Sequence, residues 1–234
     1  MNMDYIKLQD NEPTWKEIIE RKKLYAGSST KYYLNKIKKF IPDLYSQLRH
    51  TNHMRPMLKY CIKKYGNKAV VGCEVGVADG KHAFNMLYHL NTTKLYLVDI
   101  WKYYDGFFTK NRDSRTRYKN GVCDKQLSEL LDSCKRRLKR FNNNVVYIRK
   151  LSHEAIDDIH DVLDYCYLDC NHQYEYVKRD IELYFPLVKV GGVFGGHDFS
   201  PCTPNVCRAV LEFADRELLK IYGSPTDWWM IKKR

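Results

Sequence analysis

Long apolar segments are absent from this sequence. No apolar run approaches the roughly 20 residues that a membrane-spanning helix requires. The first residues, Met1 to Tyr5, also lack the charged region and apolar stretch of a secretory signal. We therefore expect neither a membrane span nor secretion, and no membrane partner.

Closely spaced cysteine pairs are missing as well. The 8 cysteines are scattered, and no two form a C-x-x-C pair. Cys166 and Cys170 could join a metal site, but Cys166 falls inside an apolar run, where free cysteine usually acts as a small hydrophobic residue. A chain of 234 residues folds without disulfides, so we expect reduced thiols and a cytoplasmic location.

Apolar and charged residues are both plentiful. Hydrophobic residues make up 44% and charged residues 29% of the chain, which fits one compact domain with a full core. The 40 basic and 28 acidic residues give a formal net charge of +12. Anionic partners such as nucleotides or nucleic acid are therefore worth considering.

The order of apolar and amphipathic segments predicts the fold class. Short apolar runs alternate with longer segments that have helical spacing. The apolar runs cover residues 69–75, 95–100, 145–148, 162–168 and 193–196, and the helical segments cover residues 81–90, 123–141, 153–160 and 174–188. This alternation predicts an α/β fold with a doubly wound, mostly parallel sheet.

The two ends of the chain extend this core. A helix over residues 205–220 and strands at 221–222 and 227–231 predict an antiparallel closing hairpin, which brings the sheet to seven strands. Residues 1–66 have helix-like spacing and predict an N-terminal helical cap, which covers the site or mediates assembly into a homo-oligomer. The main domain then spans residues 67–234. Residues 101–120 are aromatic and basic without a clear period, and are expected to form a lid beside the ligand edge.

A glycine turn follows the first predicted strand. Gly76 and Gly80 stand between this strand and its helix, where glycine allows close backbone approach and the helix N-terminus offers free N–H groups. The third glycine of a G-x-G-x-x-G dinucleotide motif is missing, which weakens an NAD-dependent oxidoreductase interpretation. Asp99 ends the second strand roughly 20 residues later, the place of a ribose-binding acid. The alternative is an Asp that orders its own loop.

Acidic and imidazole groups follow two further strands. Asp169 and His172 come after the fourth predicted strand, and His197 and Asp198 after the fifth. Adjacent parallel strands lie about 4.8 Å apart, so these four groups should converge on one rim. They would form a chemical site or a structural hydrogen-bond network that ties two strand ends together. No H-E-x-x-H spacing supports a metallo-hydrolase.

The ordered set of motifs resembles the class I S-adenosylmethionine-dependent methyltransferases, over about residues 68–234. The segment from Glu74 to Gly80 is similar to their first motif and Asp99 to the acid after their second strand. The resemblance implies a Rossmann-like methyltransferase fold in which Glu74, Gly76 and Gly80 line the methionine part of S-adenosylmethionine. It also implies that Asp99 holds the ribose and that Ser152 lies on the adenine side.

The four acidic and imidazole groups are more narrowly similar to those of metal-dependent small-molecule O-methyltransferases, which include catechol O-methyltransferase and the macrocin-type enzymes that methylate sugars. This resemblance implies that Asp169 and Asp198 bind a divalent ion, Mg²⁺ or Mn²⁺, and that His172 is the general base. Asp169 would serve the reaction, the metal and the cofactor pocket together. His197 stands where the relatives usually have a carboxylate, and as a metal ligand it would favour a transition ion.

The resemblance implies O-methylation of a hydroxyl group on a small molecule or glycan. Two other functions stay open. An RNA ribose methyltransferase would use the same fold and suit the positive charge, and a non-catalytic binding module could keep the fold with His197 in place of a carboxylate. Methylation of a base nitrogen is disfavoured, because residues 169–172 read Asp-Cys-Asn-His instead of the Asn/Asp-Pro-Pro-aromatic signature.

Overall fold

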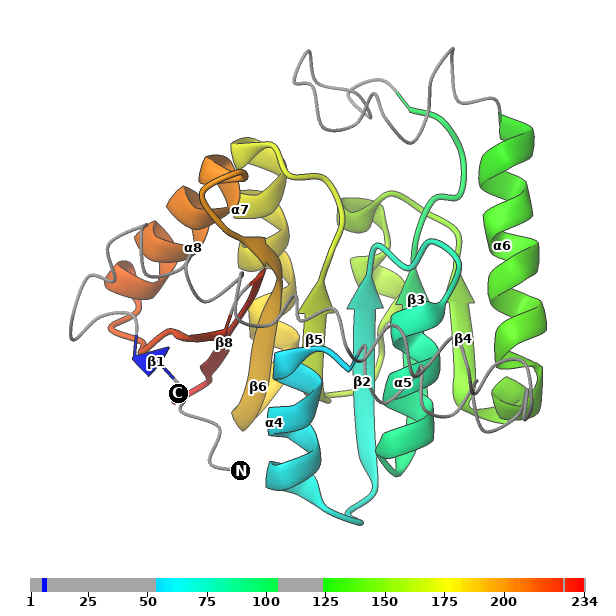
Figure 1. The fold of residues 1–234 in the computed structure, drawn as a ribbon, viewed down its shortest axis with the longest axis horizontal. Coiled ribbons are helices and arrows are strands. Elements are labelled where there is room, and N and C mark those ends of the chain that lie inside the picture. The colour runs from blue at the N-terminus through cyan, green and yellow to red at the C-terminus, as the bar shows by residue number, and fades with distance from the viewer. Residues whose placement is uncertain (1–5, 8–53, 105–123, 225, 234) are drawn as a thin grey trace, which may run out of the picture.

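A single sheet organises the chain. The computed structural model describes residues 6–7, 54–104, 124–224 and 226–233 (Figure 1). The strands are β1 (Ile6–Lys7), β2 (Val70–Val75), β3 (Thr92–Val98), β4 (Val145–Ile148), β5 (Leu163–Leu168), β6 (Val188–Phe199), β7 (Tyr222–Ser224) and β8 (Thr226–Ile231). Their order in space is β1-β7-β8-β6-β5-β2-β3-β4.

Parallel pairing is confined to the middle of the chain. β2 pairs in parallel with β3 and β5, β3 with β4, and β5 with β6, whereas β8 pairs antiparallel with both β6 and β7. The predicted fold class and the seven strands of the main domain are confirmed, including the antiparallel hairpin. The parallel strands turn their carboxyl ends to one edge of the sheet, which is where α/β folds bind their ligands.

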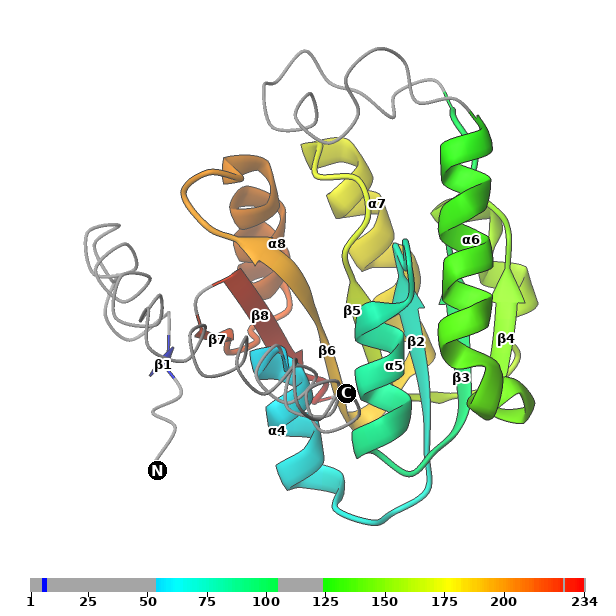
Figure 2. The same cartoon turned by 45° about the vertical axis from the view of Figure 1, so that its right-hand side comes forward.

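Helices cover both faces of the sheet. The α-helices are α4 (Pro56–Tyr65), α5 (Lys81–His89), α6 (Asp124–Leu138), α7 (Tyr174–Tyr184) and α8 (Pro204–Arg216), and the 3-10 helices are η2 (Lys139–Asn144), η3 (Ser152–Glu154), η4 (Ile156–Asp158) and η5 (Phe185–Leu187). In Figure 2, α4, α5 and α6 lie in front of the sheet, and α7 and α8 lie behind it. Within the described residues, no helix combines the length and apolar character that a bilayer crossing requires.

Side-chain alternation along β5 sorts the core into two layers. Cys166 and Leu168 join the buried cluster that includes the inner faces of α7 and α8. Tyr165 and Tyr167 point to the opposite face and join the cluster that includes α4, α5 and α6. This period of two is the ordinary consequence of strand geometry. It places the Tyr167 hydroxyl on the side of the sheet where α4 packs.

Two predicted segments differ from the structure. Residues 153–160 are expected to be one short helix, but they form the separate 3-10 turns η3 and η4. The second turn ends at Asp158 because Ile159 takes an extended backbone. Residues 6–7, expected within the helical cap, form β1, since they pair antiparallel with the edge strand β7. Helix α4 confirms part of the helical cap. The rest of residues 1–53 lies outside the described residues, and so do residues 105–120 of the lid predicted over residues 101–120.

Candidate active site

The glycine turn, residues 76–80, links β2 to α5 as predicted. Gly76 and Gly80 have φ values of 88° and 74°, in the left-handed region that favours glycine. A Cβ atom at Gly76 would lie 2.2 Å from the carbonyl oxygen of Asp169, so only glycine allows this approach to the end of β5. A Cβ atom at Gly80 would lie 2.6 Å from Cys134 Sγ. The glycine turn therefore contacts the backbone of Asp169, a member of the predicted acidic and imidazole group, directly.

Asp99 holds the glycine turn in place. Its Oδ2 accepts hydrogen bonds from the backbone N–H groups of Val77 (2.9 Å) and Ala78 (3.0 Å), and its Oδ1 accepts one from Trp101 (2.9 Å). Burial raises the pKa of Asp99, and these three N–H groups oppose that shift. The loop-ordering role that we weighed against ribose binding is thus present. A carboxylate has about four acceptor sites, so a ribose hydroxyl can still be accommodated.

Glu74 lies deeper than a cofactor contact requires. Its side chain is on β2 beneath α5, the residue is 1% exposed, and its Oε1 lies 3.0 Å from His82 Nδ1. Burial raises the pKa of Glu74 and lowers that of His82, which disfavours the charged form of each group. Among the described residues, Glu74 Oε2 and His82 Nε2 have no hydrogen-bond partner.

Ser152 follows β4 and is engaged with α7. Its Oγ donates a hydrogen bond to Asp180 Oδ1 at 2.6 Å, and its carbonyl oxygen accepts one from the Tyr184 hydroxyl at 2.7 Å. Asp180 is 1% exposed and also accepts a bond from Cys170 Sγ at 3.0 Å. The serine thus satisfies a buried carboxylate, a structural task that the sequence does not reveal.

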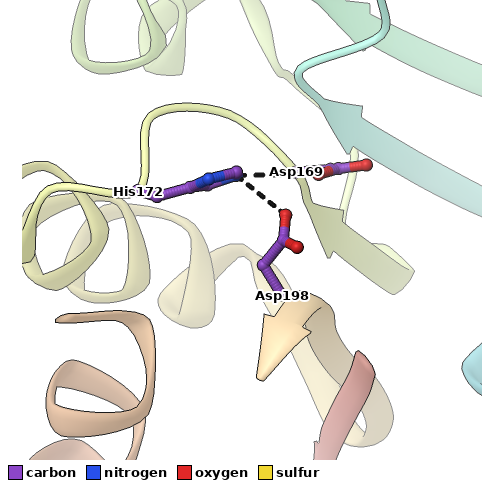
Figure 3. A group of neighbouring side chains, drawn as sticks. All are labelled: Asp169, His172 and Asp198. Atoms are coloured by element: carbon purple, nitrogen blue, oxygen red, sulfur yellow. Dashed lines mark ion pairs between the residues drawn. The ribbon is translucent and has the colours of Figure 1, made fainter. Parts of the chain in front are cut away.

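The acid-imidazole cluster, formed by Asp169, His172, His197 and Asp198, converges as predicted. Figure 3 shows three of its members, Asp169, His172 and Asp198. Asp198 Oδ2 lies 3.0 Å from His172 Nε2 and 3.1 Å from His197 Nδ1. Asp169 Oδ1 lies 3.9 Å from His172 Nε2 and 3.8 Å from His197 Nδ1. Asp198 has a φ of 60°, which is strained for a residue other than glycine. The backbone is therefore bent at the point where it delivers this carboxylate.

The charges of the cluster stabilise one another. Burial lowers the pKa of His172, but its ion pairs with Asp169 and Asp198 outweigh it and raise the pKa to about 10. Burial raises the pKa of Asp198, and the two imidazoles outweigh it and hold the pKa well below its usual range. His172 is consequently an imidazolium at neutral pH and must lose this proton before it can act as a base.

Two groups that the motifs did not reveal join the site from distant parts of the chain. Arg55, just before α4, donates hydrogen bonds to Asp169 Oδ2 and to the Tyr167 hydroxyl, each at 2.8 Å. The Tyr167 hydroxyl in turn donates to Asp227 Oδ1 at 2.9 Å. Asp227 is 1% exposed, and burial raises its pKa to about 6. A lone acid inside an apolar terminal strand was the signal for Asp227, whereas nothing near Arg55 in the sequence marks it.

The donor atoms suit a divalent ion only in part. One ligand atom each from Asp169, His172 and Asp198 lies within 4.8 Å of the others, and His197, which we predicted as a ligand, is outside this group. Mg²⁺ prefers oxygen ligands and keeps several waters. Here one carboxylate is ion-paired with Arg55 and the other with two imidazoles. In this arrangement the cluster does not fit a dedicated magnesium site.

Comparisons with known proteins bear on the fold and the family. Residues 73–199 match the family model described as a methyltransferase domain. No curated protein sequence matches the chain.

Three similar solved structures are methyltransferases by description. The O-methyltransferase NovP has a TM-score of 0.56 and 15% identity over 76% of this chain and 78% of its own. An O-methyltransferase from Bacillus cereus has a TM-score of 0.51 and 11% identity over 85% and 96%, and an rRNA methylase from Streptococcus thermophilus has 0.50 and 12% over 78% and 99%. At these identities the likeness shows the fold alone. The family match spans more than half of the chain, which therefore belongs to this methyltransferase family and has the fold of the class I S-adenosylmethionine-dependent enzymes.

Proposed function

We propose that this protein transfers a methyl group from S-adenosylmethionine to a hydroxyl oxygen of a small molecule or glycan. The observation that carries the proposal is the contact between the glycine turn and the acid-imidazole cluster. Gly76 lies against the Asp169 backbone, so a donor held at the turn would meet an acceptor held at the cluster. Alignment of two reactants in this way supplies several kcal/mol of the barrier (about 7 to 11 at best).

The cofactor half of the proposal uses the predicted residues. The N–H groups at the start of α5 and the left-handed backbone at Gly76 and Gly80 would accommodate the methionine part, with Glu74 beneath them. Asp99 would accept a ribose hydroxyl at its remaining acceptor site, and Ser152 would border the adenine. Asp99 already orders the turn, so cofactor binding and turn geometry would depend on the same carboxylate.

The acceptor half of the proposal assigns the proton to His172. The acceptor oxygen forms a bond to the methyl carbon, the carbon–sulfur bond breaks with its electron pair going to sulfur, and the hydroxyl proton moves to His172 Nε2. Asp169 and Asp198, at 3.9 and 3.0 Å from that nitrogen, stabilise the imidazolium product. The reaction is expected to speed up with rising pH, because the base is the neutral imidazole.

The proposal is tested by calorimetric binding of S-adenosylhomocysteine, followed by methyl transfer to a panel of sugar and catechol acceptors. His172→Gln should retain S-adenosylhomocysteine binding and lower kcat about a hundredfold to ten-thousandfold. His160→Gln, at an exposed histidine, is the matched control and should act like the wild type. Absence of S-adenosylhomocysteine binding in the wild type would refute the activity and leave a binding module on a borrowed fold.

RNA is the second candidate acceptor. The net charge of +12 favours it, and an rRNA methylase is among the similar folds. Against it, the basic run over residues 135–140, at the end of α6 and the start of η2, is partly engaged within the chain. Arg140 packs over Phe84, Tyr88 and Phe141, and Arg137 donates to the carbonyl oxygen of Asp79. An RNA oligonucleotide in the same assay decides between the two acceptor classes.

The location and assembly of the protein stay predictions. Free cysteines throughout the described residues support our proposal of a reducing cytoplasmic environment. Assembly into a homo-oligomer is tested by light scattering of the full chain.

A further inference from the structure

Arg55 forms an ion pair with the carboxylate of Asp169, which the resemblance identifies as a metal ligand. Its Nη2 atom lies 2.8 Å from Asp169 Oδ2, and Nη1 lies 2.8 Å from the Tyr167 hydroxyl. The guanidinium carbon lies 5.4 Å from the centre of the Tyr167 ring. The side chains of Arg55 and Asp169 are only 25% and 21% exposed, so water screens this ion pair less than a surface pair.

Helix α4 holds Arg55 in this position. Arg55 is the residue that caps α4, and Pro56 starts the helix directly after it. Two residues further on, the backbone N–H of Met57 donates to Asp227 Oδ2 at 3.0 Å. Asp227 accepts the Tyr167 hydroxyl with its other oxygen, which closes a ring of contacts from Arg55 back to α4. The arginine is thus fixed by the buried Tyr167 hydroxyl besides Asp169, and Asp227 ties that hydroxyl to α4.

The carboxylates around the cluster have partners within the chain. Arg55 is ion-paired with Asp169, and the imidazoles of His172 and His197 lie 3.0 and 3.1 Å from Asp198 Oδ2. Asp227 Oδ1 lies 4.0 Å from His197 Nε2. A guanidinium remains charged at every relevant pH and binds carboxylates with directed N–H groups. A divalent ion at Asp169 would have to displace Arg55 and lie close to its positive charge.

From this geometry we propose that Arg55 takes the place of a divalent cation at Asp169, so that this methyltransferase binds no metal there and works without one. The inference rests on the proposed function only where it says that methyl transfer works without a metal. Arg55 acts as a positioning residue: it fixes Asp169 Oδ2, which leaves Oδ1 directed toward His172 and His197. It also makes α4 a part of the site.

The test is a titration of the full chain with Mn²⁺. Binding is measured as the decrease in the paramagnetic signal of free Mn²⁺. The wild type is expected to show no saturable binding up to the highest Mn²⁺ concentration used. Arg55→Gln should show saturable binding with a Kd at least about tenfold below that concentration, because it frees a carboxylate from a competing cation. Arg55→Lys keeps the charge and should resemble the wild type. Adding Asp169→Asn to Arg55→Gln should remove the gained binding.

The matched control is Arg208→Gln, which removes an exposed arginine paired with Glu212. It should leave Mn²⁺ binding unchanged. Saturable wild-type binding that Asp169→Asn removes would overturn the proposal, and so would a folded Arg55→Gln variant that gains no site. If Arg55→Gln does not fold, the wild-type and Arg55→Lys measurements still decide.

Activity gives the second readout. Methyl transfer by the wild type is expected to be the same with EDTA and with added Mg²⁺, and loss of the rate in EDTA with recovery on Mg²⁺ would contradict the proposal. Calorimetric binding of S-adenosylhomocysteine, measured on the same samples, separates the two failures. A protein that binds neither S-adenosylhomocysteine nor Mn²⁺ refutes the methyltransferase activity and leaves the Arg55 assignment to the Mn²⁺ data.

Discussion

Two halves of the same sheet edge are built in different ways. In the cofactor half, the functional contacts are local: Glu74 pairs with His82, 8 residues away, and Asp99 bonds Val77, 22 residues away. In the acceptor half, Arg55 meets Asp169 across 114 residues, and Tyr167 meets Asp227 across 60. The first half is a single strand-turn-helix unit with its neighbouring strand. The second exists only when both ends of the chain have packed on the sheet.

The two halves touch at Gly76, and filling this contact should have the largest effect. Gly76→Ala places a Cβ atom against the Asp169 carbonyl oxygen and forces alanine into positive φ. We expect the free energy of unfolding to fall by about 2 to 4 kcal/mol, together with loss of S-adenosylhomocysteine binding. Urea denaturation and calorimetry measure the two effects.

Gly191→Ala is the matched control for Gly76→Ala. Gly191 has a φ of 77°, but nothing lies within 4 Å of its Cβ position. Alanine there should cost only the backbone strain, about 1 to 2 kcal/mol. Equal losses in the two variants would show that the contact between the two halves has no energetic weight.

Asp99→Ala should damage the cofactor half and leave the acceptor half intact. Three backbone N–H groups lose their acceptor, and the connection of the glycine turn to the end of β3 is reduced to the backbone hydrogen bond from Gly76 to Val98. We expect S-adenosylhomocysteine affinity to fall at least about tenfold, or 1.4 kcal/mol. Asp158→Ala, which removes an exposed acid paired with Lys150, controls for loss of negative charge. Unchanged affinity in Asp99→Ala would remove this residue from the cofactor site.

Asp198→Asn should change the acceptor half alone, through its pH dependence. The wild-type rate is expected to rise with pH toward the His172 pKa of about 10, since only the neutral imidazole accepts a proton. Removing the carboxylate 3.0 Å away destabilises the imidazolium, so the midpoint of the pH–rate profile should move to lower pH. S-adenosylhomocysteine affinity should not change. A midpoint that stays in place would show that another group limits the rate.

Ser152→Ala distinguishes a structural from a cofactor role with the smallest expected effect. A hydrogen bond to a charged group contributes about 1.5 to 3 kcal/mol. Relaxation around the buried Asp180 carboxylate should compensate part of its loss, so we expect the free energy of unfolding to fall by about 1 kcal/mol. If this is the only role of the hydroxyl group, S-adenosylhomocysteine affinity is unchanged. A clear loss of affinity at full stability would instead place Ser152 at the adenine.

The convergence of Asp169, His172, His197 and Asp198 could be predicted from the sequence because Asp169 and His172 follow β5, and His197 and Asp198 lie at the carboxyl end of its parallel neighbour β6. Parallel neighbours bring their carboxyl ends to one edge whatever side chains they carry. The second partner of His197 could not be predicted. His197 Nε2 lies 4.0 Å from Asp227 Oδ1, and Asp227 comes from an antiparallel strand that reaches the site only after the closing hairpin forms.

Hydrophobic periodicity and turn glycines by themselves determined the α/β order, the cofactor turn and the edge where the polar groups gather, because these depend on spacing along a short stretch of chain. Only the tertiary structure decided which partners those groups have. Arg55 reaches Asp169 because α4 packs against the closing strands, and Asp99 turns to the glycine turn because the backbone N–H groups of Val77 and Ala78 lie within hydrogen-bond distance of it. Charge compensation is a matter of distance in space, to which spacing in sequence gives no access.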